Sequence, residues 1–268
     1  METDLQLAQR AAIAGAAVAL PHFAALADLP QETKADGSVV TAADRAVETA
    51  IREVLADARP DDAVLGEEYG QDTPGTGRRW IIDPIDGTAL FVAGDDRWLI
   101  LIALEEAGEI VAGVAAHPAQ SSIFWAARGE GAFEGRIIGG RVVAPTRIGV
   151  TEPGTDDLTG CRFSAVPETW APHLVQPLAA VADQRPWPVH PGLLVARGDL
   201  DLALQTGGQI WDFAATSLIL TEAGGSFGGL DGGTRPATGA SLYARSPALR
   251  LAALDLLSDA RPAAAQTT

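Results

Sequence analysis

The chain has 268 residues, with 35 Asp and Glu against 19 Lys and Arg, so its formal net charge is −16. This surplus argues against a partner such as nucleic acid or an anionic membrane, because phosphate backbones and acidic lipids bind basic surfaces. It also makes a phosphorylated ligand unfavourable unless a cation intervenes. Hydrophobic residues make up 47% of the chain and charged residues 20%, which is typical of a globular protein.

The cysteine content and the N-terminus predict a cytoplasmic protein. The single cysteine, Cys161, cannot form an internal disulfide, and we expect it to be a small buried apolar residue. Residues 1–10 include acidic residues and lack the basic and apolar regions of a signal peptide. The apolar stretch 11–20 is too short to cross a bilayer, so no membrane segment is expected.

The first half of the chain is predicted to begin with two helices. Leucines and alanines at helical spacing indicate a helix over 4–28. Thr41 followed three residues later by Asp44 resembles a capping box, which predicts a second helix over 42–57. Apolar runs then indicate an antiparallel sheet with a tight turn at Ala107-Gly108. The strands expected in this sheet are two within 98–117 and a third at 122–128, and further strands are expected at 63–65 and 80–82.

The second half is predicted to form another layer of helices and strands. Its expected elements are a helix at 171–182, strands at 192–195 and 200–204, a helix at 212–223, a strand at 241–245 and a helix at 247–257. No linker separates independent domains, so we expect one domain, 1–268, with halves of about 1–145 and 146–268. Mixed helices with an antiparallel sheet predict an α+β fold.

The most informative motif is WIIDPIDGT at 80–88, in which Asp83 and Asp86 follow a buried strand. Pro84 restrains the backbone between them, and Gly87 permits a tight turn. Both carboxylates can therefore point at one place, while the amides of Gly87 and Thr88 begin a helix, where a phosphate can bind. An Asp-Gly turn is commonly structural when it occurs alone, but the whole nonapeptide is far more specific.

Three further segments place acids at the ends of predicted elements. Glu67 and Glu68 follow a strand, whereas Asp212 and Asp44 begin helices. Each has a structural interpretation, as a solvated strand end or as a charge that complements a helix dipole. Together with Asp83 and Asp86 they predict a cluster, and clustered carboxylates cannot all ionise without cations. Oxygen ligands favour Mg²⁺ or Mn²⁺ over zinc.

In order and spacing, these motifs resemble the inositol monophosphatase superfamily of Mg²⁺-dependent, lithium-sensitive phosphatases. The resemblance extends from about 11 to 257, and KADGS, GEEYG and the segment 91–119 are most similar to the histidinol-phosphate phosphatase branch. The segments that carry it are Lys34 with 36–44, Gly66-Glu67-Glu68, 80–88, 211–215 and 222–225. It implies a layered α/β/α/β/α sandwich of the sugar-phosphatase type and a homodimer.

The resemblance also implies roles for the residues of the acidic cluster. Glu67, Asp83 and the carbonyl of Ile85 would hold a first ion, which activates a water. Asp83, Asp86 and Asp212 would hold a second, which stabilises the leaving oxygen in a two-metal reaction. Glu68 would lie beside the first ion and help hold a third. Two or three Mg²⁺ ions are expected, with Mn²⁺ as a substitute and Li⁺ as an inhibitor.

The resemblance further implies a proton-transfer pair and a phosphate site. Asp44 and Thr88 would orient or deprotonate the water, so they join Glu67 as catalytic residues, and the Gly87 and Thr88 amides would bind phosphate. Lys34, the only lysine of the chain, is a candidate substrate contact. The expected partner is a small phosphorylated metabolite, with neither nucleic acid nor membrane.

Two departures from the family pattern concern the substrate. Gln205 stands where a Glu seven positions before the metal-binding Asp commonly contacts the leaving group, and the segment 185–191 is shortened. His190 lies in that segment and is a second candidate substrate contact. A neutral Gln205 recognises a cationic amine less well than a Glu would, which counts against simple transfer of histidinol phosphate as the substrate.

We therefore predict a phosphomonoesterase and leave the substrate open. Histidinol phosphate comes first, inositol monophosphate second and a 3′,5′-bisphosphate nucleotide third. The competing hypothesis is a metal-stabilised regulatory homologue that retains the fold without turnover.

Overall fold

The computed structural model describes two compact units of the chain. It covers residues 2–26, 31–33, 39–71, 77–150 and 157–259. Unit 1 comprises 1–147 with 210–222, and unit 2 comprises 148–209 with 223–268. Helix α6 (Ile210–Glu222) therefore belongs to unit 1, although it lies in the second half of the sequence. The prediction of one domain in two sequential halves stays a prediction.

Unit 1 begins with two helices that confirm the sequence prediction. They are α1 (Asp4–Ala24) and α2 (Ala42–Ala58). The capping box at the start of α2 is formed, since Thr41 Oγ1 accepts from the amide of Ala43 and Asp44 accepts from the amide of Thr41 at 2.8 Å. The predicted extension of the first helix to residue 28 is wrong for the described residues, because the helix ends at Ala24.

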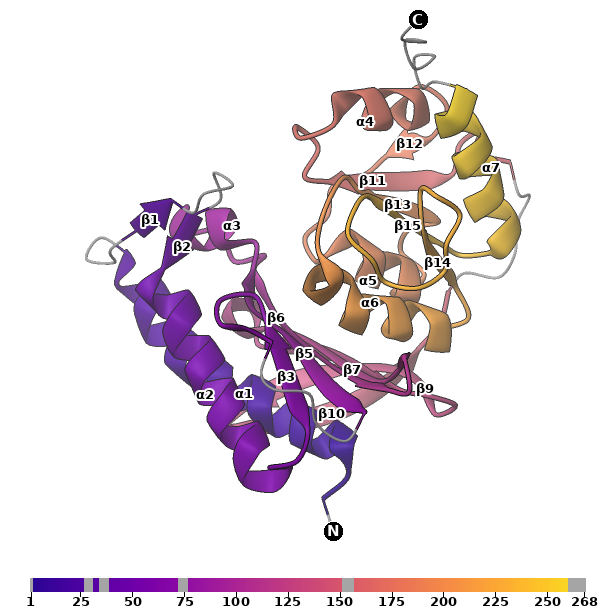
Figure 1. Ribbon diagram of the computed structural model, residues 1–268. Coiled ribbons are helices and arrows are strands. Elements are labelled where there is room, and N and C mark those ends of the chain that lie inside the picture. Colours follow the sequence, from indigo (N-terminus) through magenta and orange to yellow (C-terminus); the bar gives the residue numbers. More distant parts are fainter. Residues whose placement is uncertain (1, 27–30, 34–38, 72–76, 151–156, 260–268) are drawn as a thin grey trace, which may run out of the picture. The chain divides into compact units, whose positions relative to one another are not determined.

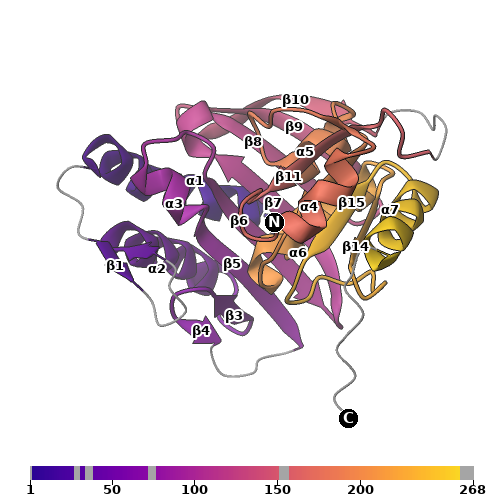
Figure 2. The same ribbon diagram turned by 90° about the horizontal axis from the view of Figure 1, so that it is seen from above.

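The larger sheet of unit 1 has eight strands in the order β10-β9-β8-β7-β6-β5-β3-β4 (Figure 2). The predicted hairpin is formed by β6 and β7, and Ala107 and Gly108 both take positive φ, as a two-residue hairpin turn requires. A separate two-stranded sheet pairs β1 (Gln31–Thr33) with β2 (Val39–Thr41). The strands of the larger sheet are β3 (Ala63–Gly66), β4 (Gly70–Gln71), β5 (Arg78–Asp86), β6 (Leu99–Glu106), β7 (Glu109–His117), β8 (Ser122–Ala127), β9 (Gly131–Ile138) and β10 (Arg141–Ile148).

Helices cover both faces of this sheet (Figure 1). On one face, α1 and α2 form a hydrophobic core with Trp80, Ile82 and Ile100. On the other face, α6 lies so close to β7 that a Cβ atom at Gly113 would be 2.9 Å from the carbonyl oxygen of Ala215. Side chains alternate between the faces of a strand, so Asp83 shares the face of Ile81, opposite to Ile82.

Unit 2 contains a five-stranded sheet in the order β12-β11-β13-β15-β14. A core of α4, α7 and the sheet includes Phe163, Leu204 and Leu249. On the other sheet face, α5 packs through Gly192 against Tyr243. The strands are β11 (Arg162–Val166), β12 (Asp183–Gln184), β13 (Leu202–Gln205), β14 (Ser226–Gly229) and β15 (Ser241–Ala244), and the helices are α4 (Pro172–Ala179), α5 (Pro191–Arg197) and α7 (Pro247–Asp259).

One element of unit 2 was predicted wrongly from the sequence. The strand expected at 192–195 is the helix α5, which begins after His190 as N-cap with Pro191 at its first position. Gly198 ends the helix in a left-handed conformation with φ of 85°. The short apolar run is buried throughout, so its sequence carries no periodicity that separates a helix from a strand.

The helices and the sheets of the two units together make this an α+β protein, as predicted. Gly224 follows α6 with φ of 90°, a left-handed conformation that is common after the end of a helix. Among the helices of the described residues, none combines the length and apolarity needed to span a bilayer.

Candidate metal centre

The centre lies at the end of β5, where the strand carries a bulge. Asp83 pairs with Leu101 of β6, but Asp86 pairs with Leu99, so three residues of β5 lie opposite two of its neighbour. In a regular strand, residues three apart point to opposite faces. The extra residue restores a common direction for Asp83 and Asp86, which the motif alone could not specify.

Glu67 reaches the same end of the sheet from the neighbouring parallel strand. Gly66 of β3 pairs with Ile82 of β5, and the amide of Glu67 donates to the carbonyl of Ile82 at 3.2 Å. Glu67 therefore follows β3 at the level where Asp83 lies in β5. Parallel strands bring their carboxyl ends to one edge, so two separate motifs converge there.

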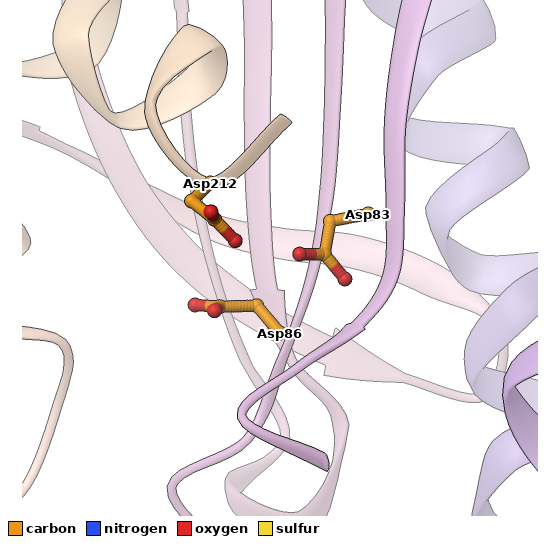
Figure 3. A group of neighbouring side chains, drawn as sticks. All are labelled: Asp83, Asp86 and Asp212. Atoms are coloured by element: carbon orange, nitrogen blue, oxygen red, sulfur yellow. The ribbon is translucent and has the colours of Figure 1, made fainter. Parts of the chain in front are cut away.

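Asp212, which joins Asp83 and Asp86, comes from the first turn of α6. Its carboxylate points toward those of Asp83 and Asp86 (Figure 3). One carboxylate oxygen from each of the three residues lies within 4.8 Å of the others. Asp83 is buried, and Asp86 and Asp212 are partly buried. The structure thus brings together three of the predicted metal ligands from two segments more than 120 residues apart.

The electrostatics of this cluster fit a divalent cation. Burial raises the pKa of the Asp83 carboxyl well above its ordinary value, and the nearby charges of Glu67, Asp86 and Asp212 raise it further. Burial, Asp212 and Glu67 likewise raise the pKa of Asp86. Asp83 Oδ1 is buried without a hydrogen-bond partner. A divalent ion would satisfy that oxygen and offset the repulsion, and an all-carboxylate set suits Mg²⁺ or Mn²⁺.

The predicted proton-transfer pair is in hydrogen-bond contact. Thr88 Oγ1 lies 3.0 Å from Asp44 Oδ1 and 3.1 Å from the Ile85 carbonyl oxygen, either of which can accept its single proton. The other oxygen of Asp44 accepts from the amide and the hydroxyl of Thr41, at 2.8 and 2.6 Å. Asp44 is fully buried, so the N-terminus of α2 holds its carboxylate in a fixed direction.

The segment after β5 turns sharply into a short helix. Gly87 takes φ of 82° as the N-cap of α3 (Thr88–Val92), a conformation that favours glycine. The Gly87 carbonyl accepts from the amides of Leu90 and Phe91. The turn therefore directs Thr88 back toward Ile85, three residues earlier, so that the Thr88 hydroxyl contacts the Ile85 carbonyl.

The turn that carries Glu67 and Glu68 is attached to a residue that the sequence analysis missed. The amide of Glu68 donates to Glu48 Oε2 at 2.8 Å, and Glu48 is fully buried in α2. In the sequence, Glu48 lies four residues after Asp44 and so on the same helix face, which was the available signal. It precedes Arg52 by four residues, a spacing that also suits an ordinary surface ion pair.

The candidate substrate contacts of unit 2 lie together in a buried polar group. The amide of Gly192 donates to His190 Nδ1 at 3.1 Å, so Nε2 carries the proton and donates to Gln205 Oε1 at 3.2 Å. Tyr243 donates to the same oxygen of Gln205 at 3.3 Å. Burial lowers the pKa of His190 to about 4, against the opposite effect of its hydrogen bond with Gln205. Lys34 lies outside the described residues.

Cys161 is buried as expected, and burial raises the pKa of its thiol to about 11.

Comparison with known proteins agrees with this architecture. The model of the inositol monophosphatase family matches residues 1–261. A histidinol-phosphatase of Mycobacterium tuberculosis is 40% identical over 89% of this chain and 92% of its own. An inositol-1-monophosphatase of Rhizobium meliloti is 32% identical over 82% of this chain and 83% of its own. The crystal structure of the extragenic suppressor protein SuhB of Bartonella henselae, 27% identical, superimposes with a TM-score of 0.76, covering 92% of this chain and 95% of that one.

The chain therefore belongs to the inositol monophosphatase family, a family of phosphatases.

Proposed function

We propose that this protein is a Mg²⁺-dependent phosphomonoesterase that hydrolyses a small phosphorylated metabolite by direct attack of water. The observation that carries the proposal is the convergence of Asp83, Asp86 and Asp212 on one point, with a buried Asp83 oxygen that has no hydrogen-bond partner. Phosphoryl transfer requires positive charge at such a point, because the phosphate and the leaving oxygen are both negative.

The proposed ligands divide as the sequence analysis expected. Glu67, Asp83 and the Ile85 carbonyl would hold one ion, and Asp83, Asp86 and Asp212 a second, with Glu68 beside the first. Bound there, divalent ions supply a water of lowered pKa and positive charge for both the attacking and the leaving oxygen. Mn²⁺ is the proposed substitute, and Li⁺ the proposed inhibitor.

In this proposal the chain's own residues move the proton of the attacking water. Thr88 Oγ1 accepts that proton while it donates its own to Asp44 Oδ1, along the 3.0 Å contact between them. Asp44 keeps its direction during the transfer because Thr41 holds its other oxygen. The amides of Gly87 and Thr88 are the proposed donors to the phosphate oxygens.

The proposed substrate is histidinol phosphate or a close relative. The support is the name and coverage of the Mycobacterium tuberculosis relative at 40% identity. Inositol 1-phosphate is the second candidate, since a relative at 32% identity carries that name. A 3′,5′-bisphosphate nucleotide is the third. Lys34, His190 and Gln205 remain candidate contacts to the leaving group, and a cytoplasmic homodimer is the proposed form.

A phosphate-release panel tests the proposal. The purified protein would be treated with EDTA and assayed on the three candidate substrates and on general phosphomonoesters, with and without Mg²⁺. We expect Mg²⁺-dependent release that is fastest with histidinol phosphate. Tight metal binding by calorimetry without release from any substrate would instead support the regulatory homologue.

A further inference from the structure

One face of α2 carries three polar side chains at successive turns of the helix. Asp44, Glu48 and Arg52 are spaced four residues apart, so they lie along one side of α2. Asp44 contacts Thr88. Glu48 and Arg52 contact the segment Gly66–Gly70, which we call the GEEYG turn and which carries Glu67 and Glu68.

The Glu48 carboxylate is enclosed by this turn. Its Oε2 accepts from the amide of Glu68 at 2.8 Å, and its Oε1 accepts from the amide of Tyr69 at 3.3 Å. A Cβ atom at Gly66 would lie 2.0 Å from Oε1 and 2.4 Å from Cδ, so only a glycine allows this approach. Two successive amides and one glycine thus fix the backbone on both sides of Glu67.

Arg52 joins the same carboxylate to the end of the turn. Its Nε donates to Glu48 Oε1 at 2.8 Å, and its Nη2 donates to the carbonyl of Gly70 at 2.7 Å. The guanidinium carbon also lies 5.9 Å from the centre of the Tyr69 ring. The Tyr69 hydroxyl donates to the carbonyl of Arg45 at 3.4 Å, which attaches the turn to α2 at another point.

A contribution to stability alone is a weak explanation for the ion pair of Glu48 and Arg52. A buried ion pair loses hydration of both charges, and hydrophobic residues of the same volume are often equally stable. A carboxylate that accepts from specific backbone amides provides position instead, as the outer partners of metal ligands do in other sites.

We propose that Glu48 is a positioning residue, which holds the GEEYG turn on α2 and thereby sets the place of the Glu67 carboxylate beside Asp83. The inference rests on the proposed function, because it concerns the metal affinity of that site. It follows that α2 orients two parts of the centre. At its first turn Asp44 contacts Thr88, and one turn later Glu48 holds the turn that carries Glu67.

The test is Mn²⁺ binding to the full-length metal-free protein, measured by calorimetry and by electron paramagnetic resonance. In Glu48→Gln, one amide of the turn would face an NH₂ group, which cannot accept its hydrogen bond. We expect the Mn²⁺ dissociation constant to rise by about 10- to 100-fold, the range for partners of metal ligands, with an unchanged circular dichroism spectrum. In Mg²⁺ titrations of activity, the activation constant should rise more than kcat falls.

Asp62→Asn is the matched control, since Asp62 lies directly before β3, whose other end begins the GEEYG turn. Asp62 is largely buried and accepts from Arg78 and from the Trp80 indole, each at 3.0 Å. This variant should lower the melting temperature and leave the Mn²⁺ dissociation constant unchanged. If Glu48→Gln fails to fold, Gly66→Ala displaces the carboxylate without altering its charge and should raise the dissociation constant similarly.

The outcomes separate the two proposals. If the wild type binds Mn²⁺ and both Glu48→Gln and Gly66→Ala bind it equally tightly, the positioning role is overturned and the metal site is not. An equal loss of affinity in Asp62→Asn would also overturn it, because the effect would then follow from general destabilisation. No Mn²⁺ binding by the wild type would overturn the metal site and this inference with it.

Discussion

Asp83 is the residue on which the proposed chemistry depends most directly, because both proposed ions share it and it is the most buried of Asp83, Asp86 and Asp212. Asp83→Asn removes a ligand while keeping its shape. We expect kcat to fall by about 10²-fold or more, as for the loss of a group that stabilises transition-state charge. The metal-free variant should be no less stable than the wild type, since burial and its neighbours already disfavour the Asp83 charge.

Phosphate release and thermal unfolding in EDTA measure these two effects. Asp231→Asn, at an exposed aspartate of unit 2, is the control and should change neither. Retention of more than a few per cent of activity by Asp83→Asn would contradict the two-metal assignment.

His190 provides a pH prediction at the same scale. Its pKa is about 4 in the folded chain and about 6.5 in an unfolded one, so it is neutral in both states above pH 7. As the pH falls below 6.5, only the unfolded state gains the proton, and the folded state loses relative stability. Between pH 7 and pH 4.5 this residue should cost about 2 kcal/mol of unfolding free energy.

Urea unfolding at the two pH values measures this cost. His190→Gln should lose about 2 kcal/mol less than the wild type over the same interval. His173→Gln, at an exposed histidine of α4, should behave as the wild type does. Identical pH dependence in all three proteins would contradict the lowered pKa of His190 in the folded state.

The sequence identified the acidic residues of the centre well, but not the residues that hold them in position. Asp83 and Asp86 were evident because Pro84 and Gly87 make the motif between them specific. Glu48 was missed, because a charged helix residue four positions before an arginine is most often solvated. In unit 2, Asp201 has a comparable internal role: Arg162 and Arg245 enclose it, and its pKa falls to about 2 despite the opposing effect of its partial burial.

At the scale of elements, the centre depends on how closely α6 approaches the sheet. A Cβ atom at Gly113 would lie 2.9 Å from the carbonyl oxygen of Ala215 and 3.1 Å from its Cα, so neither contact can relax by a side-chain rotation. Asp212 lies three residues before Ala215. Gly113→Ala should displace α6, lower the unfolding free energy by about 1–3 kcal/mol and weaken Mn²⁺ binding as well.

Thermal unfolding and Mn²⁺ calorimetry test this coupling of packing to the centre. Gly149→Ala is the control, because its nearest neighbour would be the Ala223 carbonyl oxygen at 3.7 Å. It should leave both quantities close to those of the wild type. A Gly113→Ala protein with reduced stability but unchanged Mn²⁺ affinity would show that α6 accommodates the added methyl group without moving Asp212.

Elements were predictable where the sequence carries a cap or a period. The capping box located the start of α2, and Ala107-Gly108 located the hairpin turn. The helix α5 was predicted as a strand because all of its apolar residues are buried, which removes the amphipathic signal. The local signal of the bulge in β5 is Pro84, because a proline inside a central strand is confined to bulges, but the register of the bulge depends on the pairing with β6.

At the scale of the whole molecule, the sequence could not predict which unit each segment joins. Unit 1 takes α6 from the second half of the chain, and Glu222 at the end of that helix accepts from the amide of Gly129 in the β8–β9 turn and from that of Gly131 at the start of β9. These pairs are more than 90 residues apart, so no local pattern indicates them. The anchored helix places Asp212 at its opposite end.

The net charge of −16 gives two explanations for any stabilisation by Mg²⁺, and they differ in concentration dependence. Any salt screens the general repulsion of a highly charged chain. A specific ion at Asp83, Asp86 and Asp212 should instead saturate and stabilise by about 2.7 kcal/mol at 100 times its dissociation constant. We therefore expect millimolar Mg²⁺ to raise the melting temperature of EDTA-treated protein far more than NaCl of equal ionic strength, and to do so less in Asp212→Asn. Equal increases with both salts would assign the effect to screening and leave the acidic cluster without a role in binding.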